Sequence, residues 1–278
     1  MRDAAPDNQL ERDIAAFKDM ERWWKGGYYE GDPLDPIGIS NYGKMGFMSV
    51  LYATYLTCIK PYVRGDSVVL EIGPGRGAWT RAFLHAKEIW CLDALSAENN
   101  NFWNYVGQAP QVKYFQVTDF SCSMVPENAI DYFFSFGCFC HVSFAGVTEY
   151  MKNLRTKLKD GAHCFIMVAD FKKYNAMIDN IDQFDVAKNF SEVFQGFKGL
   201  KFKLIRSLYR LLYQLTRGTH NLPGRGRRVD INVKYDAKLK WYDAGTERTC
   251  AMLRGLGYTI VDPDVRVNYR DPVIHFTK

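Results

Sequence analysis

Short apolar segments alternate with amphipathic ones from residue 67 onward, and this alternation restricts the possible folds more than any other feature. Five apolar segments have the length of strands, at 67–72, 89–93, 112–117, 129–136 and 162–168. Helical patterns follow some of them, most clearly at 75–84 and 147–158, and a further amphipathic helix is predicted before the first strand, over 45–63. Nearly continuous apolar strands have to be buried on both faces. The pattern therefore predicts an α/β fold with a mostly parallel sheet covered by helices on each side.

The alternation stops after residue 170 and resumes at Thr246, where a helix closed by Gly257 precedes two further strands, 258–261 and 272–276. We therefore predict three parts: an N-terminal helical cap, residues 1–66; a sheet domain, residues 67–170 and 244–278; and an inserted basic substrate cap, residues 171–243. Open α/β sheets bind ligands at the carboxyl ends of their strands, so both caps are expected to cover that edge.

Composition bounds the class of protein. Of the 278 residues, 47% are apolar and 24% are charged, which is enough apolar content for a buried core and excludes a disordered chain. No run reaches the roughly 18 apolar residues of a membrane span, and the first residues do not resemble a signal peptide. The seven cysteines form no C-x-x-C pair and mostly lie in apolar runs. This usage predicts reduced thiols in a cytoplasmic protein.

The most specific motif follows the first strand and reads Glu71-Ile72-Gly73-Pro74-Gly75-Arg76-Gly77-Ala78. A glycine-rich turn between a strand and a helix lets a ligand approach the backbone closely. The spacing also satisfies the fingerprint of dinucleotide-binding folds, which alone is a weak signal. Glu71 favours another ligand, because a carboxylate at the strand end would repel a pyrophosphate. S-adenosylmethionine has no phosphate and carries an ammonium and a sulfonium group, so it tolerates an acid there.

Two further acids end the next two strands. Asp93 stands 22 residues after Glu71, where a carboxylate can accept hydrogen bonds from both hydroxyls of a ribose. Asp119 ends the third strand, where it can accept from an adenine amino group while Phe120 packs on the ring. Three acids and a glycine turn at successive strand ends favour a nucleoside without phosphates over NAD.

These residues resemble the first motif of the class I S-adenosylmethionine-dependent methyltransferases, acid-x-Gly-x-Gly-x-Gly, which is complete from Glu71 to Gly77. The resemblance spans about residues 67–170 and resumes at Thr246. It implies a Rossmann-like, mostly parallel seven-stranded sheet with an antiparallel last strand. It also implies S-adenosylmethionine as cofactor and S-adenosylhomocysteine as product. The cofactor pocket would be formed by Glu71, Gly73, Gly75, Gly77, Asp93, Ala94, Asp119, Phe120, Ser135 and Phe136.

The segment after the fourth strand, residues 135–143, also resembles a bacterial subset of the family described as sugar O-methyltransferases. A hydroxyl must lose its proton while it attacks the methyl group, so a positioned base speeds the reaction. His141 is the candidate general base, because an imidazole pKa near 6.5 suits that task. The alternative is that His141 only shapes the pocket. Asp170, at the end of the fifth strand, is a second catalytic candidate, which could orient a hydroxyl, assist His141 or cap a helix.

Two other functions remain open from the sequence. N-methylation of a small amine would use the same cofactor and would not need His141. A regulatory protein could keep the nucleoside pocket without catalysis. No metal is expected, because Cys138, Cys140 and His141 lack a second pair of ligands, and Asp131 starts its strand at a distance from the predicted site.

The net charge of +5 is unevenly distributed. Residues 188–228 contain ten Lys and Arg and one acid, a local charge of +9 that leaves −4 for the rest of the chain. Within them, residues 197–218 form a basic amphipathic segment that either packs on the sheet domain or lies on the inner face of an anionic membrane. The basic loop that follows predicts an anionic sugar or glycan acceptor, contacted by Tyr28, Tyr29, Tyr42, Arg225, Arg227 and Arg228. RNA is the weaker alternative, because no RNA-binding module is recognisable.

Overall fold

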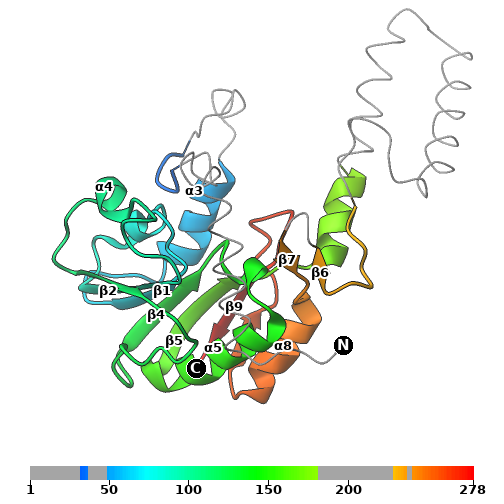
Figure 1. Ribbon diagram of the computed structural model, residues 1–278. Helices are drawn as coiled ribbons and strands as arrows, with labels where there is room; N and C mark the ends of the chain where they lie inside the picture. Colours follow the sequence, from blue (N-terminus) through cyan, green and yellow to red (C-terminus); the bar gives the residue numbers. More distant parts are fainter. Residues whose placement is uncertain (1–31, 37–48, 181–227, 237–239) are drawn as a thin grey trace, which may run out of the picture. The chain divides into compact units, whose positions relative to one another are not determined.

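The computed structural model describes residues 32–36, 49–180, 228–236 and 240–278 (Figure 1). The chain divides into two compact units, one made of Met1–Asp170 with Val233–Lys278 and the other of Phe171–Asn232. The first unit contains the sheet. In the second unit, the described residues form a helix at 171–180, and the side chain of Asn175 exchanges two hydrogen bonds with the backbone of Val229, at 2.8 and 2.9 Å.

Seven strands form one sheet in the order β3-β2-β1-β4-β5-β9-β8. Their bounds are Val68–Ile72 (β1), Glu88–Asp93 (β2), Val112–Gln116 (β3), Ile130–Ser135 (β4), Leu158–Met167 (β5), Thr259–Asp262 (β8) and Val273–Thr277 (β9). The first five run parallel, and β9 pairs antiparallel with both β5 and β8. The predicted sheet, mostly parallel with an antiparallel last strand, is confirmed.

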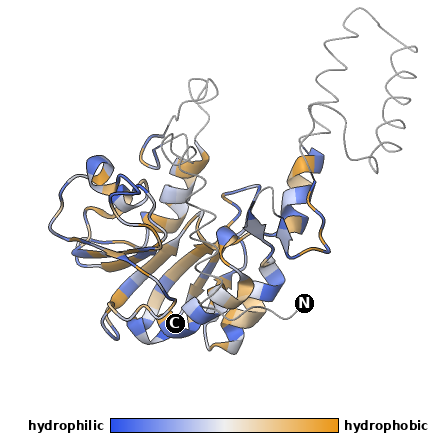
Figure 2. Cartoon of the chain, viewed as in Figure 1, coloured by the Kyte–Doolittle hydropathy of each residue, from blue (hydrophilic) through white to orange (hydrophobic). Residues whose placement is uncertain are grey.

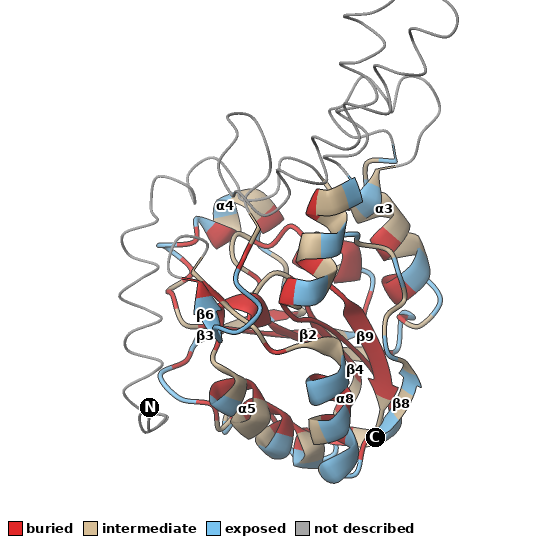
Figure 3. Ribbon diagram, turned by 90° about the vertical axis from the view of Figure 1, so that its right-hand side faces the viewer, coloured by how far each residue is buried: buried red, intermediate tan, exposed pale blue. Residues whose placement is uncertain are grey.

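Helices cover both faces of this sheet. Figure 3 shows α3 (Val50–Thr54) and α4 (Phe102–Val106) on one side, and α5 (Phe144–Lys157) and α8 (Thr246–Gly255) on the other. The central strands are therefore closed off from water on both faces, and in β1 the residues 69–72 are all buried. Figure 2 shows the strands as a largely hydrophobic layer, which is the burial that the continuous apolar segments predicted.

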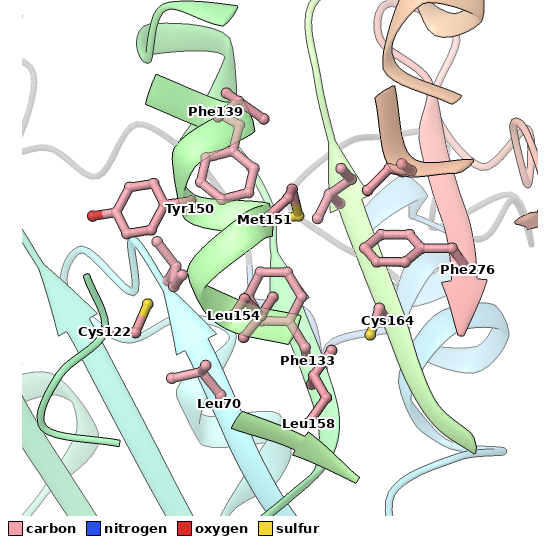
Figure 4. Close-up of a cluster of buried hydrophobic side chains, with 14 of the residues drawn as sticks. Leu70, Cys122, Phe133, Phe139, Tyr150, Met151, Leu154, Leu158, Cys164 and Phe276 are labelled. Atoms are coloured by element: carbon pink, nitrogen blue, oxygen red, sulfur yellow. The ribbon is translucent and has the colours of Figure 1, made fainter. Parts of the chain in front are cut away.

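The main hydrophobic core lies between the sheet and α5 (Figure 4). The helix turns Val147, Tyr150, Met151 and Leu154 toward the strands, spaced three and four residues apart, and all four are buried. Burial of a side chain of this size contributes roughly 1.5–3 kcal/mol. The helix begins after Ser143, whose hydroxyl oxygen accepts from the N–H of Gly146 at 3.2 Å. This start fixes the position of the segment before it, which carries His141.

Three predicted helices differ from the structure. Over 75–84 the chain forms turns and a short 3-10 helix, Thr80–Phe83 (η3), because Gly75 and Gly77 have positive φ angles that no α-helix continues. Over 45–63 the described residues form α3, which continues as a π-helix, Tyr55–Ile59 (η2). The third helix, α5, begins three residues before its predicted start, because Ser143 caps it.

The end of the insertion also differs. The compact unit that begins at Phe171 ends at Asn232 rather than at residue 243. A hairpin of two short antiparallel strands, Tyr235–Asp236 (β6) and Trp241–Tyr242 (β7), belongs to the sheet unit. Strands of two residues are too short to produce a recognisable period in the sequence.

Two histidines face each other on the adjacent strands β5 and β9. His163 Nδ1 on β5 and His275 Nε2 on β9 are 3.0 Å apart, and the ring of Tyr62 packs against both imidazoles. His275 is buried. Burial lowers the pKa of His275 to about 4, and the charge of His163 acts in the same direction. The pair is therefore neutral at physiological pH.

His275 should make the stability of the fold depend on pH. Below about pH 6.5 the unfolded chain binds a proton on this histidine that the folded chain does not bind until the pH approaches 4. Its contribution is thus intact above pH 6.5 and is lost as the pH falls, by about 2 kcal/mol at pH 5. Urea unfolding at pH 7 and pH 5 measures this loss. His275→Phe should lose less stability than the wild type, and an equal loss in both would contradict the assignment.

Candidate active site

The glycine turn lies at the carboxyl end of β1, which has β2 and β4 as neighbours in the sheet. Gly73, Gly75 and Gly77 have φ angles of 74°, 54° and 93°, a region that favours glycine. The N–H of Gly73 donates to the carbonyl of Leu92 at 2.8 Å and holds the turn against β2. The turn thus lies at the edge of the sheet where ligands of such folds bind.

Two of these glycines leave no room for a side chain. A Cβ on Gly73 would lie 2.3 Å from the Cβ of Cys138, and a Cβ on Gly77 would lie 2.1 Å from Cγ2 of Val106. Gly77 therefore packs the turn on α4. Gly73 packs it on the segment that follows β4, which leads to His141.

The carboxylate of Asp93, at the end of β2, fastens the glycine turn. Its Oδ2 accepts from the N–H of Gly75 at 3.0 Å, and its Oδ1 accepts from the N–H of Leu95 at 2.9 Å. Burial raises the pKa of Asp93, and these two bonds oppose that shift. The sequence predicts a ribose contact for Asp93, and the structure adds a role in holding the turn.

Glu71 lies one residue before the end of β1 and is buried. Its Oε2 accepts a hydrogen bond from the hydroxyl of Thr80 at 2.6 Å. Burial raises the pKa of Glu71 to about 8; the Thr80 bond opposes this shift, and the charge of Asp93 adds to it. The carboxyl group is therefore mostly protonated at neutral pH. Glu71 is therefore a neutral carboxyl group here, in contrast to the charged carboxylate that the sequence predicts.

The third strand brings Asp119 and Phe120 to the same edge, since the backbone N–H of Val117 donates to the carbonyl of Asp93 at 2.7 Å. Asp119 is exposed, and its Oδ1 accepts from the N–H of Ser121 at 2.8 Å. Phe120 is buried, with its ring centroid 4.8 Å from that of Tyr150 in α5. The ring of Phe120 thus packs in the protein core, whereas the sequence predicts that it packs on the adenine.

Ala94, Ser135 and Phe136, the other predicted cofactor residues, make contacts inside the protein. The carbonyl of Ala94 accepts from Gln116 Nε2 at 3.1 Å. The hydroxyl of Ser135 donates to the carbonyl of Ile72 at 2.9 Å and joins β4 to β1. The buried ring of Phe136 lies 4.9 Å, centroid to centroid, from that of Trp79. The side chains of Ser135 and Phe136 thus contact Ile72 and Trp79, the residues that flank the glycine turn.

His141 ends a short 3-10 helix, Phe139–His141 (η4), and is buried. Its Nδ1 lies 2.9 Å from the carbonyl oxygen of Lys240, in the turn before β7. Burial lowers the pKa of His141 to about 4; the hydrogen bond to Lys240 raises it, and the charge of Arg270 lowers it further. The imidazole is therefore neutral at physiological pH.

Asp170 contacts the start of α8. Its Oδ2 accepts from both the N–H and the hydroxyl of Thr246, at 2.9 and 2.7 Å. An acceptor at this position satisfies a backbone N–H that has no partner within the helix. Asp170 thus caps α8, which is one of the three roles that the sequence left open.

Several predicted residues lie outside the described part of the chain. They are the acceptor candidates Tyr28, Tyr29, Tyr42, Arg225 and Arg227, and the amphipathic segment 197–218. Arg228 is described, and its Nη2 forms an ion pair with Asp179 in the same unit.

The described residues contain neither a metal cluster nor a membrane-spanning helix, and one cavity lies away from the glycine turn. No three His, Cys, Asp or Glu side chains come together there as a metal site. None of the helices in the described ranges combines the length and apolarity needed to span a bilayer. A cavity of about 350 Å³ is lined by Ser67, Asp131 and Lys159 among others. It lies at the amino ends of β1, β4 and β5, opposite the glycine turn.

Thr80 and Lys240 are the functional candidates that the sequence does not reveal. Thr80 bonds Glu71 from nine residues away, and the Lys240 carbonyl contacts His141 across 99 residues. The Lys240 contact uses a backbone atom that every residue type has, so no sequence signal marks it. The threonine at the start of η3 offers only a weak hint.

The packing of Gly73 can be tested against a matched glycine. Gly107 also has a positive φ, 83°, but a Cβ there would meet nothing within 4 Å. Gly107→Ala should cost about 1 kcal/mol of stability from its backbone alone. Gly73→Ala adds the clash with Cys138 and should cost about 2–4 kcal/mol. Denaturant unfolding of both variants measures the difference, and equal losses would show that the turn is not held by this contact.

Comparisons with known proteins agree with this architecture. A family model described as a methyltransferase domain matches residues 47–215. No curated protein matches the chain.

Two methyltransferases are among the solved structures that share the fold. An S-adenosylmethionine-dependent methyltransferase from Mesorhizobium loti aligns with a TM-score of 0.54 and 14% identity, over 83% of this chain and 98% of that one. The 1,6-didemethyltoxoflavin-N1-methyltransferase of Burkholderia thailandensis, solved with 1,6-didemethyltoxoflavin and S-adenosylhomocysteine, aligns with a TM-score of 0.56 and 15% identity, over 100% and 92%. The family model covers more than half of the chain, and the sheet, its strand order and the glycine turn agree with it. The chain therefore belongs to the methyltransferase domain family and is an S-adenosylmethionine-dependent methyltransferase.

Proposed function

We propose that the enzyme transfers the methyl group of S-adenosylmethionine to a hydroxyl of a sugar or another small anionic acceptor, with His141 as the proton acceptor. The observation that carries this proposal is the hydrogen bond between His141 Nδ1 and the Lys240 carbonyl, at 2.9 Å. A carbonyl oxygen can only accept, so Nδ1 holds the proton of the neutral ring. The lone pair is then on Nε2, where a base needs it.

The position of His141 supports this role. Cys138 packs on Gly73 in the glycine turn, and its carbonyl accepts from the backbone N–H of His141 at 2.9 Å. One turn of 3-10 helix therefore separates the imidazole from the loop assigned to the methionine part of the cofactor. Proximity of this kind supplies much of the rate of a displacement reaction.

The chemistry needs only a weak base. As the acceptor oxygen attacks the methyl carbon, the carbon–sulfur bond breaks and its electron pair goes to sulfur, which becomes the neutral thioether of S-adenosylhomocysteine. The attacking hydroxyl becomes strongly acidic while the oxygen–carbon bond forms, and its proton passes to Nε2. Burial holds the pKa of His141 at about 4, so Nε2 is unprotonated before the reaction begins.

We assign the cofactor contacts to the residues at the carboxyl edge of the sheet. The backbone of Gly73 and Gly75 would hold the methionine part, Asp93 the ribose and Asp119 the adenine amino group. The exposed carboxylate of Asp119 and the backbone of the turn are accessible to such contacts, in contrast to Phe120 and Phe136. The N-terminal cap and the insertion would contact the acceptor, and the +9 charge of residues 188–228 favours an anionic one.

N-methylation is the second candidate function. The Burkholderia thailandensis enzyme, which has the same fold, is an N1-methyltransferase. An amine attacks as soon as it is unprotonated and needs no base in this place. The pH dependence of the reaction separates the two possibilities.

The pH profile of methyl transfer tests the role of His141. A screen with isotope-labelled S-adenosylmethionine, using phosphorylated and nucleotide sugars, first identifies an acceptor. With a hydroxyl acceptor, kcat should stay constant from pH 8 to about pH 5 and fall only as His141 is protonated near pH 4. His141→Ala should lower kcat about 100-fold or more and leave the affinity for S-adenosylhomocysteine unchanged. A rate that rises with pH as an amine acceptor loses its proton, and is untouched in the variant, would establish N-methylation instead.

The adenine assignment is tested by calorimetry with S-adenosylhomocysteine. Asp119→Ala removes an exposed carboxylate and should weaken binding about 10- to 100-fold, because a hydrogen bond to a charged group contributes about 1.5–3 kcal/mol. Glu98→Ala removes another exposed acid and serves as the control. Equal affinities of Asp119→Ala and wild type would contradict the adenine contact, and no binding by the wild type would contradict the cofactor itself.

A further inference from the structure

We infer that Lys240 is a positioning residue for the reaction, and that its main-chain carbonyl, held by a left-handed backbone, fixes the tautomer and direction of the His141 imidazole. The inference rests on the proposed function of His141. It extends that proposal by naming the group that holds the imidazole in place, a main-chain carbonyl 99 residues away in the sequence.

The backbone of Lys240 has an unusual conformation. Its φ angle is 54°, in the left-handed region that residues with a Cβ rarely adopt. Such a conformation costs free energy and persists only where the surrounding contacts require it. Here the residue next to β7 turns its carbonyl oxygen to within 2.9 Å of His141 Nδ1.

The chain around Lys240 is fastened on several sides. Asp243, just after β7, forms a parallel bridge with Ala169, and the Ala169 carbonyl accepts from the N–H groups of Ala244 and Gly245, both at 3.0 Å. These bonds tie the hairpin to the end of β5. Asp170 then caps α8 through Thr246, so it acts on the hairpin and on His141 only indirectly.

The buried side chain of Trp241 fastens the other side. The guanidinium of Arg270 lies 4.4 Å from the centre of its ring, and Arg270 Nε donates to the buried carboxylate of Asp271. The loop between β8 and β9 therefore holds β7 in place, while β7 packs beside η4. These contacts hold the chain around Lys240, and its carbonyl is the group that contacts the imidazole of His141.

A carbonyl acts on the imidazole differently from a carboxylate. Both accept the Nδ1 proton and leave the lone pair on Nε2. A carboxylate would also stabilise the protonated ring through its negative charge and raise the pKa. The neutral carbonyl fixes the tautomer without that effect, and the charges of Arg270 and Lys240 further disfavour protonation of His141.

Substitutions at position 240 separate the backbone effect from the side chain. Lys240→Gly removes the side chain and accepts a positive φ, whereas Lys240→Val disfavours it strongly because valine is β-branched. Asn128 offers a matched control, since it is an exposed residue with a φ of 49° just before β4 and belongs neither to the chain around Lys240 nor to the loop between β8 and β9. Asn128→Val imposes the same backbone change without touching His141.

NMR of the full-length enzyme labelled with ¹⁵N-histidine gives the tautomer of His141 without any acceptor. Wild type, Lys240→Gly and Asn128→Val should all show a protonated Nδ1 and an unprotonated Nε2, and Lys240→Val should show a mixture of the two tautomers. With the acceptor from the screen, Lys240→Val should lower kcat about tenfold and leave the KM for S-adenosylmethionine unchanged. The kcat of Lys240→Gly should stay within about twofold of the wild-type value. If Lys240→Val does not fold, Lys240→Ala replaces it.

Two results would overturn the inference. One is a wild-type His141 spectrum in Lys240→Val, and the other is a mixture of tautomers in Asn128→Val. The failure of the proposed function looks different: the Lys240→Val spectrum then changes as expected, but kcat does not. That outcome would keep the positioning contact and reject His141 as the base.

Discussion

The contact between Gly73 and Cys138 is the constraint on which the site depends. Because Gly73 has no side chain, the glycine turn after β1 and the segment after β4 approach each other to van der Waals distance. The turn brings the residues assigned to the cofactor, and the segment brings His141. Any side chain at position 73 would move the two apart, and a displacement reaction tolerates little error in the distance between its reactants.

The strands of the sheet could be predicted from the sequence, and some of the residues around them could not. Strands such as β1 and β4 are buried on both faces, so nearly every residue in them has to be apolar and the pattern is unambiguous. The hairpin of β6 and β7 has only two residues in each strand, and its place is set by backbone hydrogen bonds to Ala169. Such bonds leave no trace in the pattern of side chains.

The candidate site shows the same division. The glycines were predictable, since only glycine fits a positive φ in so close a contact. Phe120 and Phe136 follow the strands that the sequence predicts, but their rings pack into the core. Their partners there, Tyr150 and Trp79, come from elements distant in sequence, so these contacts could not be predicted. The protonated state of Glu71 depends on burial, which only the tertiary structure determines.

The bridge between Ala169 and Asp243 has a consequence for how such an enzyme can evolve. Ala169 pairs with Asp243, and the backbone N–H of Asp243 donates to the carbonyl of Lys234 at 2.9 Å, so Asp243 joins the two chain segments between which the 62-residue unit Phe171–Asn232 lies. Lengthening or replacing a segment whose ends are fixed in this way costs little closure entropy. Under the proposed function, a new acceptor preference would then be acquired by exchanging that segment as a module, while the turn, the hairpin and His141 are inherited unchanged.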